Sequence, residues 1–349
     1  MNTETLTFTR FIAAICVVVF HYGTNVFPFN TDLLSTFFSK SNTFVSYFFF
    51  LSGFVMIIAY NKKIISGNLN KKKYWLKRFA RIYPIYLFAL LFYVGIVWYF
   101  EYNTINKRDF IYNILLIQAF FKDSATSLNF PGWSLSVELI FYLSFPFLTQ
   151  LIYRISFKHN CYIYLVVWVL SQIVSVTLLN NHYNPLIHLN TFWGGILLAK
   201  FLIQFETRLT PIRNQAKWIL FISLVILISL LGTQNILSPH LHDGLLVPIF
   251  ALIIFGLVYS NISILSNSAF ARLGEISYGI YILQYPTTYF VRYINDKTSH
   301  FFFNNQHSEF YFYIIILTLL SFVTYYLIEI PFKKLILNKI RFITKPKLH

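Results

Sequence analysis

Two residues of the first apolar segment are of types that can do chemistry. The segment reads RFIAAICVVVFHY, with Arg10 and His21 eleven residues apart. On a helix, eleven steps end within ~20° of three full turns, so both side chains share one face, about 16 Å apart along the axis. Histidine can act as a general base near neutral pH, and arginine can bind an anion. An arginine that snorkels toward the membrane surface beside a structural histidine is the alternative explanation.

A second polar stripe lies in the segment PGWSLSVELIFYLSFPF. Ser134, Glu138 and Tyr142 follow one another at intervals of four residues, which places them on one helical face. A carboxylate without a partner in apolar surroundings is costly, so Glu138 needs one. His21 has a similar predicted depth, and a carboxylate can fix the tautomer of a histidine that serves as a general base. A structural polar contact between two helices explains the same residues equally well.

A strongly basic stretch precedes the third apolar segment. It reads NKKIISGNLNKKKYWLKRFARIYPIY and contains eight basic residues and no acidic residue. Anionic lipid would attract most of this charge. Arg78 and Arg81 differ from the rest because they lie three residues apart, on one face, where the chain enters the apolar segment. Guanidinium groups bind phosphates through paired hydrogen bonds, so this pair predicts a site for an anionic ligand.

Other motifs are weaker. His240, His242 and Asp243 stand close together in a loop, but no further ligands follow at a usual metal-site spacing, so we predict no metal site. Ser52 and Gly53, in FFFLSGF, are small residues of the kind that let helices pack closely. The sequence contains no Walker loop and no dinucleotide-binding fingerprint.

The composition identifies the surroundings in which these residues work. Of 349 residues, 57% are hydrophobic and 11% are charged, whereas soluble domains average about 25% charged residues. This excludes a soluble globular protein. The net charge of +16 is typical of the cytoplasmic loops of membrane proteins, so it does not indicate nucleic-acid binding. Cys16 and Cys161 both lie in apolar runs, and we predict two buried thiols without a disulfide.

Ten apolar segments approach the ~20 residues that a membrane-spanning helix needs. They are residues 8–27, 43–60, 82–100, 133–153, 161–180, 186–203, 218–232, 244–260, 276–294 and 310–331. The stretch 110–121 has only twelve residues, so we expect it to be interfacial or re-entrant. With both termini in the cytoplasm, 22 of the 28 basic residues fall on the cytoplasmic side.

The predicted fold is therefore an all-α integral membrane protein with about ten transmembrane helices and both termini cytoplasmic. Residues 1–332 form a single transmembrane domain. Residues 333–349 form a basic cytoplasmic tail that resembles an interfacial helix bound to anionic lipid. We expect no fused soluble domain.

These segments, in this order, resemble the acyltransferase family 3 membrane proteins over nearly the whole chain. The family is known for the spacing of Arg10 and His21 and for the Arg-x-x-Arg pattern that Arg78 and Arg81 match. Six further segments look like its remaining signatures: FFFLSGF, RIYPIY, WSLSVELIFYLSFPF, FWGGILLA, LGEISYGIYILQYP and IEIPFKKL.

The chain departs from the family pattern at two positions. Gln284 stands where the family commonly has histidine, and Ile330 stands where many members have arginine. The first departure argues against a general base at that position. It leaves His21 as the only intramembrane histidine for which we predict a partner.

The resemblance implies an O-acyltransferase of the bacterial inner membrane. Such proteins move an acyl group, most often acetyl, from cytoplasmic acyl-CoA to a hydroxyl of a cell-surface or lipid-linked saccharide. The donor is a substrate, so no permanently bound cofactor is expected. The resemblance implies that His21 is the general base or a transient acyl carrier and that Glu138 orients it. It also implies that Arg10, Arg78 and Arg81 bind CoA.

Two alternatives remain open. A transporter or flippase for a lipid-linked sugar would also carry buried charges, although the repeated halves common in transporters are not evident in the sequence. An acyl-transfer enzyme with a non-sugar acceptor is the other alternative. The predicted partners are acyl-CoA, the acceptor and the lipid bilayer, with no nucleic acid, and the sequence leaves the oligomeric state open.

Overall fold

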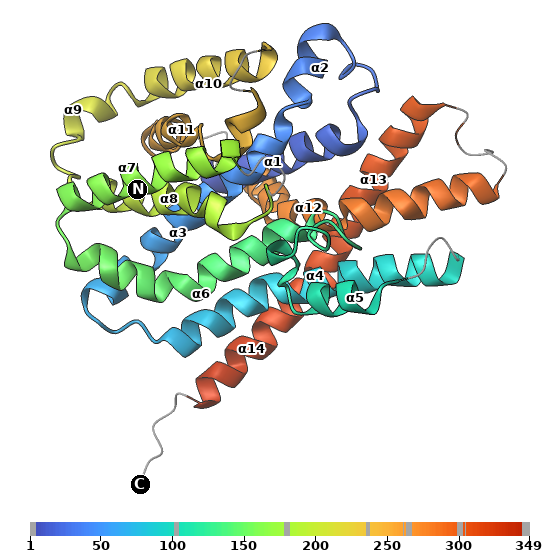
Figure 1. Cartoon of the computed structure of the whole chain (residues 1–349), viewed down its shortest axis with the longest axis horizontal. Helices are drawn as coiled ribbons and strands as arrows, with labels where there is room; N and C mark the ends of the chain where they lie inside the picture. The colour runs from blue at the N-terminus through green and yellow to red at the C-terminus, as the bar shows by residue number, and fades with distance from the viewer. Residues whose placement is uncertain are drawn as a thin grey trace. The chain divides into compact units, whose positions relative to one another are not determined.

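The computed structural model describes residues 5–100, 105–177, 182–234, 238–260, 262, 267–298, 303 and 305–343. The side chains of residues 238–240 and 340–343 lie outside this description. Within the described ranges every regular element is a helix (Figure 1). Among the residues that the structure describes, seven helical stretches are long and apolar enough to cross a membrane. The prediction of an all-α, multi-pass membrane protein is therefore confirmed.

Each of the ten predicted segments coincides with a helix, but ten spans are not confirmed. The helices are α1 (Thr5–Tyr22), α3 (Phe44–Ile65), α4 (Lys71–Phe100), α6 (Gly132–Arg154), α7 (Phe157–Thr177), α8 (Pro185–Gln204), α10 (Ala216–Gly232), α11 (Val247–Tyr259), α12 (Ser268–Lys297) and α13 (Gln306–Thr324). Helices α10 and α11 have 17 and 13 residues, so they fall short of the ~30 Å apolar core of a bilayer. Helix α12 carries charged residues at both ends and is not among the seven apolar stretches.

The twelve-residue apolar stretch 110–121 forms only short helices. Helix α5 (Lys107–Ile114) has eight residues and rises about 12 Å, too little to cross a bilayer. A 3₁₀ turn, η2 (Gln118–Phe120), follows it. Tyr86 of α4 donates a hydrogen bond to the Asn113 carbonyl oxygen at 2.7 Å, which holds this stretch against α4. These lengths agree with the predicted interfacial or re-entrant position.

The chain forms two compact units, which we describe separately. Unit 1 comprises Met1–Lys62 and Gln150–Tyr281, and unit 2 comprises Lys63–Thr149 and Ile282–His349. The boundaries fall within α3, α6 and α12.

Two glycines allow helices α3 and α8 of unit 1 to pack backbone against backbone. A Cβ atom on Gly53 would lie 2.1 Å from the Phe192 carbonyl oxygen. A Cβ atom on Gly195 would lie 1.9 Å from the Phe50 carbonyl oxygen. Both distances are far below van der Waals contact, so each position requires glycine. The prediction that Gly53 serves close helix packing is confirmed.

The two cysteines differ in burial, so one prediction is wrong. Cys16 is buried in α1, whereas Cys161 is exposed on α7. Several apolar neighbours of Cys161 on α7 are exposed as well, including Leu165, Val166 and Leu170. An apolar run does not reveal whether a side chain faces protein or lipid, because both environments favour the same residues.

In unit 2, a buried pair of aromatic rings joins α4 to α6. The rings of Tyr74 and Phe145 stack with their centroids 5.2 Å apart. Helix α13 continues through a π-helical turn (Tyr325–Glu329) into α14 (Ile330–Ile343), and α14 packs against α4. Residues 333–343 of the predicted basic tail thus belong to a continuous helix, and residues 344–349 lie outside the described residues.

Candidate functional site

Arg10 and His21 lie on one unbroken helix of unit 1. Helix α1 contains both residues, with His21 in its last turn. The regular helix gives them the shared face and the separation of about 16 Å that the spacing predicts. Both side chains are partly buried. One helix therefore holds a cation and an imidazole near opposite ends.

Unit 2 brings Arg78, Arg81 and Glu138 together around Tyr142. The Tyr142 hydroxyl on α6 donates a hydrogen bond to the Glu138 carboxylate one turn earlier. The Arg78 guanidinium lies over the Tyr142 ring, 5.7 Å from its centroid, and over the Tyr74 ring at 6.0 Å. Arg81 follows Arg78 by three residues on α4, so the two guanidinium groups lie on one helical face. The sequence motifs of α4 and α6 therefore form one charged cluster, which we call the Arg–Tyr–Glu cluster.

The remaining member of the predicted stripe acts at the start of α6. The Ser134 hydroxyl donates to the Pro131 carbonyl oxygen at 3.0 Å. The Glu138–Tyr142 half of the stripe meets Arg78 through the Tyr142 ring. Sequence reasoning grouped Tyr142 with Glu138 but did not connect it to Arg78.

A pocket of about 300 Å³ opens beside this cluster. Arg78 and Tyr142 contribute to its lining, together with mainly apolar and aromatic side chains. The lining residues are Lys72, Trp75, Leu76, Arg78, Phe79, Leu139, Tyr142 and Leu143. Two cations at an apolar pocket suit a ligand that joins an anionic group to an apolar or aromatic one.

His21 and Glu138 belong to different units, so their pairing remains a prediction. Within unit 2, the Glu138 carboxylate accepts a hydrogen bond from the Tyr142 hydroxyl. Arg10 belongs to unit 1, and the arginine pair of α4 belongs to unit 2.

A buried polar group in unit 1 was missed by sequence reasoning. His188 of α8 lies close to His242 and Asp243 at the end of the 3₁₀ segment η3 (Ser238–Asp243), and candidate ligand atoms of the three lie within 4.8 Å of one another. His182 Nδ1 is 3.1 Å from Asp243 Oδ2. His21 is therefore not the only histidine in a predicted span with a polar partner, because residues 186–203 include His188.

The charge of Asp243 is stabilised by its neighbours. Burial raises the pKa of Asp243, but its hydrogen bonds with His182 and His242 outweigh that effect and hold the pKa well below its usual range. The sequence offered one signal for this group, the His-x-His-Asp run at 240–243. The proximity of His188 comes from packing and has no local signature.

Comparisons with known proteins agree with this architecture. The acyltransferase family 3 profile, an acyltransferase domain, matches residues 4–326. The chain is 28% identical over 225 residues to "Putative acetyltransferase ORF330" of Acidianus two-tailed virus, a match covering 62% of this chain and 65% of that protein. It is 29% identical over 168 residues to "Acyltransferase MdmB" of Streptomyces mycarofaciens, covering 45% of this chain and 42% of that protein.

These matches span less than two thirds of either relative. A shorter match of 46 residues, 48% identical, covers 13% of this chain and 24% of "Protein 2 in picA locus" of Rhizobium radiobacter. No solved structure matches the chain. Because the family profile covers nearly the whole chain, this protein belongs to the acyltransferase family 3 membrane proteins.

Proposed function

We propose that this chain is a membrane O-acyltransferase. It moves an acyl group, most often acetyl, from cytoplasmic acyl-CoA to a hydroxyl of a cell-surface or lipid-linked saccharide. The observation that carries the proposal is the Arg–Tyr–Glu cluster beside its pocket in unit 2. Family membership supports acyl transfer as the reaction class. We place the protein in the bacterial inner membrane.

Donor binding is assigned to α4. Arg78 and Arg81 bind CoA phosphates through charge-assisted hydrogen bonds, since a guanidinium matches phosphate oxygens with two parallel donors. Lys72 adds a further cation at the pocket, and the Trp75 ring offers a face for the adenine base. A volume of about 300 Å³ is at the lower end for ligand sites, so the pocket takes one part of the donor. Arg10 assists entry of the donor from α1.

The chemistry is assigned to His21. It accepts the proton of the acceptor hydroxyl while the oxygen attacks the thioester carbon. A new ester bond forms, the carbon–sulfur bond breaks, and the proton passes to the departing CoA thiolate. Transient acylation of His21 is the second route to the same products. Glu138 orients His21 in either route.

The length of the donor is compatible with phosphate binding by the arginines and acyl transfer at His21. A pantetheine arm extends roughly 15–20 Å by chain arithmetic. Arg10 and His21 are about 16 Å apart along α1. A donor whose phosphates stay near the cytoplasmic end of the helices can therefore present its thioester near His21.

The test measures thioester consumption in the presence of an acceptor. Purified full-length protein in lipid nanodiscs receives acetyl-CoA and a membrane extract that supplies acceptor hydroxyls, and released CoA thiol is quantified with a thiol reagent. Wild type should release CoA faster than empty nanodiscs, whereas His21→Ala should not. His307→Ala is the matched control, because His307 is an exposed histidine at the start of α13. If wild type consumes no thioester whichever acceptor extract is added, the result would favour the transporter alternative.

The acceptor is identified by mass spectrometry of surface glycans from cells with and without the gene. An acetyl substituent that disappears without the gene and returns with wild type supports a saccharide acceptor. Thioester consumption with unchanged glycans would assign the protein to a non-sugar acceptor. Membrane fractionation of the same cells tests the inner-membrane location.

A further inference from the structure

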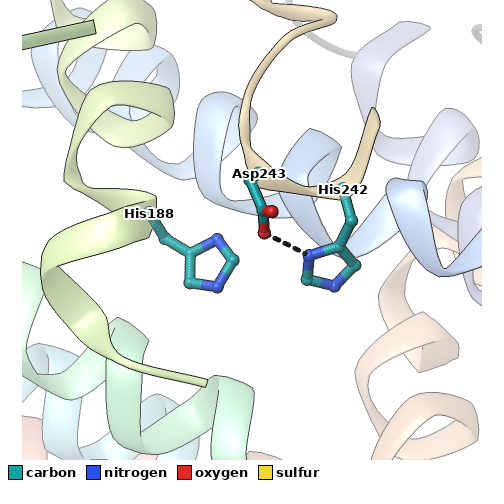
Figure 2. Close-up of side chains that lie close together, drawn as sticks. All are labelled: His188, His242 and Asp243. Carbon is teal, nitrogen blue, oxygen red and sulfur yellow. Dashed lines mark ion pairs between the residues drawn. The ribbon is translucent and has the colours of Figure 1, made fainter. Parts of the chain in front are cut away.

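Three potential metal ligands of unit 1 lie close together. His188 comes from the first turns of α8, and His242 and Asp243 come from the end of η3 (Figure 2). Their candidate ligand atoms all lie within 4.8 Å of one another. Figure 2 shows the two imidazole rings and the carboxylate facing a shared space. The group is shielded from solvent, since His188 and Asp243 are fully buried and the His242 side chain is 11% exposed.

The chain holds Asp243 in a fixed orientation. Ser175 of α7 donates to the Asp243 carboxylate, and His182 Nδ1 lies 3.1 Å from its Oδ2 atom. The closer contacts engage Oδ2, while Oδ1 is 3.4 Å from both His182 Nδ1 and His242 Nδ1. Hydrogen bonds that orient a ligating carboxylate are a regular feature of metal sites.

Hydrogen bonds also fix the backbone of the loop that contains Asp243 and Gly244. Gln172 and Asn190 donate to the Asp243 carbonyl oxygen at 3.0 and 3.2 Å. Trp168 donates to the Gly244 carbonyl oxygen at 3.0 Å. Gly244 has a φ of 95°, a conformation that glycine adopts without strain. Side chains of α7 and α8 thus fix the turn that presents His242 and Asp243.

His188 has the outer-shell contact expected of a metal ligand. Its Nε2 atom lies 2.7 Å from the His182 carbonyl oxygen. A proton on Nε2 that is donated to this carbonyl gives Nδ1 the lone pair that coordination requires. Ligating histidines commonly donate their second ring nitrogen to a backbone carbonyl in this way.

We propose that His188, His242 and Asp243 form a binding site for a divalent transition-metal ion of the zinc type. Two imidazole nitrogens and one carboxylate oxygen are ligands that zinc accepts, and a water completes a tetrahedron. Zinc at about 2.0–2.1 Å from each ligand requires ligand atoms roughly 3.3 Å apart. Because the ligand atoms lie within 4.8 Å of one another, the side chains have to close by at most about 1.5 Å when the ion binds, which ring rotation can supply. The ion would tie the start of α8 to the loop before α11.

The test measures metal content and does not depend on acyl transfer. Full-length protein in detergent is equilibrated with Zn²⁺ buffered by a weak chelator, freed of excess metal and analysed by mass spectrometry for zinc. Wild type should retain about one zinc per chain, and His242→Asn and Asp243→Asn should each lose most of it. His159→Asn, which changes an exposed histidine of α7, should bind like wild type. Size-exclusion profiles and helical circular dichroism confirm that each variant is folded.

A second measurement keeps the proposal testable if a variant fails to fold. Wild type loaded with Co²⁺ should show the intense visible bands of tetrahedral coordination. Wild type that retains less than about a tenth of a zinc per chain would overturn the proposal, as would a Co²⁺ spectrum like that of the hydrated ion. Zinc retained equally by folded His242→Asn and Asp243→Asn would also overturn it and would leave a hydrogen-bonded polar network at this place.

Discussion

The replacement Arg78→Lys tests how the donor is held. Lysine keeps the positive charge but lacks the planar fork that binds two phosphate oxygens at once. It also weakens the stacking of the guanidinium over the rings of Tyr74 and Tyr142, which lie 6.0 and 5.7 Å away. The perturbation is confined to the wall of the pocket in unit 2.

The magnitude follows from the contacts that are lost. A hydrogen bond to a charged group contributes about 1.5–3 kcal/mol, and lysine can replace one of the two that arginine donates. Loss of the other bond predicts a rise in the KM for acetyl-CoA of roughly 10–150-fold. The kcat should change little, because the phosphates are remote from the reacting carbon and contribute similar binding in ground and transition states.

The assay compares two donors. Acetyl-CoA carries the phosphates, whereas a short acetyl thioester of cysteamine type does not. Arg78→Lys should weaken use of acetyl-CoA and leave use of the short thioester unchanged. Arg108→Lys, at a side chain of α5 that is 56% exposed, is the matched control and should match wild type with both donors. An equal loss with both donors would refute phosphate binding by Arg78.

Two further predictions concern Tyr142 and the packing glycines. Tyr142→Phe keeps the ring beside Arg78 but removes the hydroxyl that donates to Glu138. The kcat should therefore fall about tenfold or more, while the KM for acetyl-CoA changes less than in Arg78→Lys. An unchanged kcat would show that the Tyr142–Glu138 hydrogen bond does not contribute to the reaction. Gly195→Ala places a methyl group 1.9 Å from the Phe50 carbonyl oxygen and should lower thermal stability in detergent by several degrees. Gly95→Ala is its control, because a Cβ atom there meets nothing within 4 Å and alanine favours a helix by about 0.5–1 kcal/mol; equal Tm values for the two variants would contradict the packing argument.

The helices of this protein were predictable because their signals are local. Runs of apolar residues marked every segment, and the stretch at 110–121, predicted to be too short to span, forms the eight-residue α5 and a 3₁₀ turn. The number of membrane spans was harder to predict from the sequence, because α10 and α11 are apolar but short. Length and hydropathy do not decide how such helices lie in a bilayer.

The candidate site was predictable in its parts but not in its contacts. The spacing of polar residues within apolar segments identified Arg78, Arg81 and Glu138 as candidate site residues. Their meeting at Tyr142 depends on the packing of α4 against α6, which no local pattern encodes. The proximity of His188 to Asp243 was missed for the same reason, since the two residues lie on separate elements.

The central claim is that His21 carries out acyl transfer from acyl-CoA. The most direct measurement is single-turnover reaction of labelled acetyl-CoA with purified wild type, His21→Ala and His307→Ala in nanodiscs with a membrane extract from the host. We predict label in an acceptor and stoichiometric free CoA for wild type and His307→Ala, with the rate reduced at least a hundredfold in His21→Ala, about the smallest effect expected of a general base. Folded His21→Ala that transfers label at the wild-type rate would contradict the account.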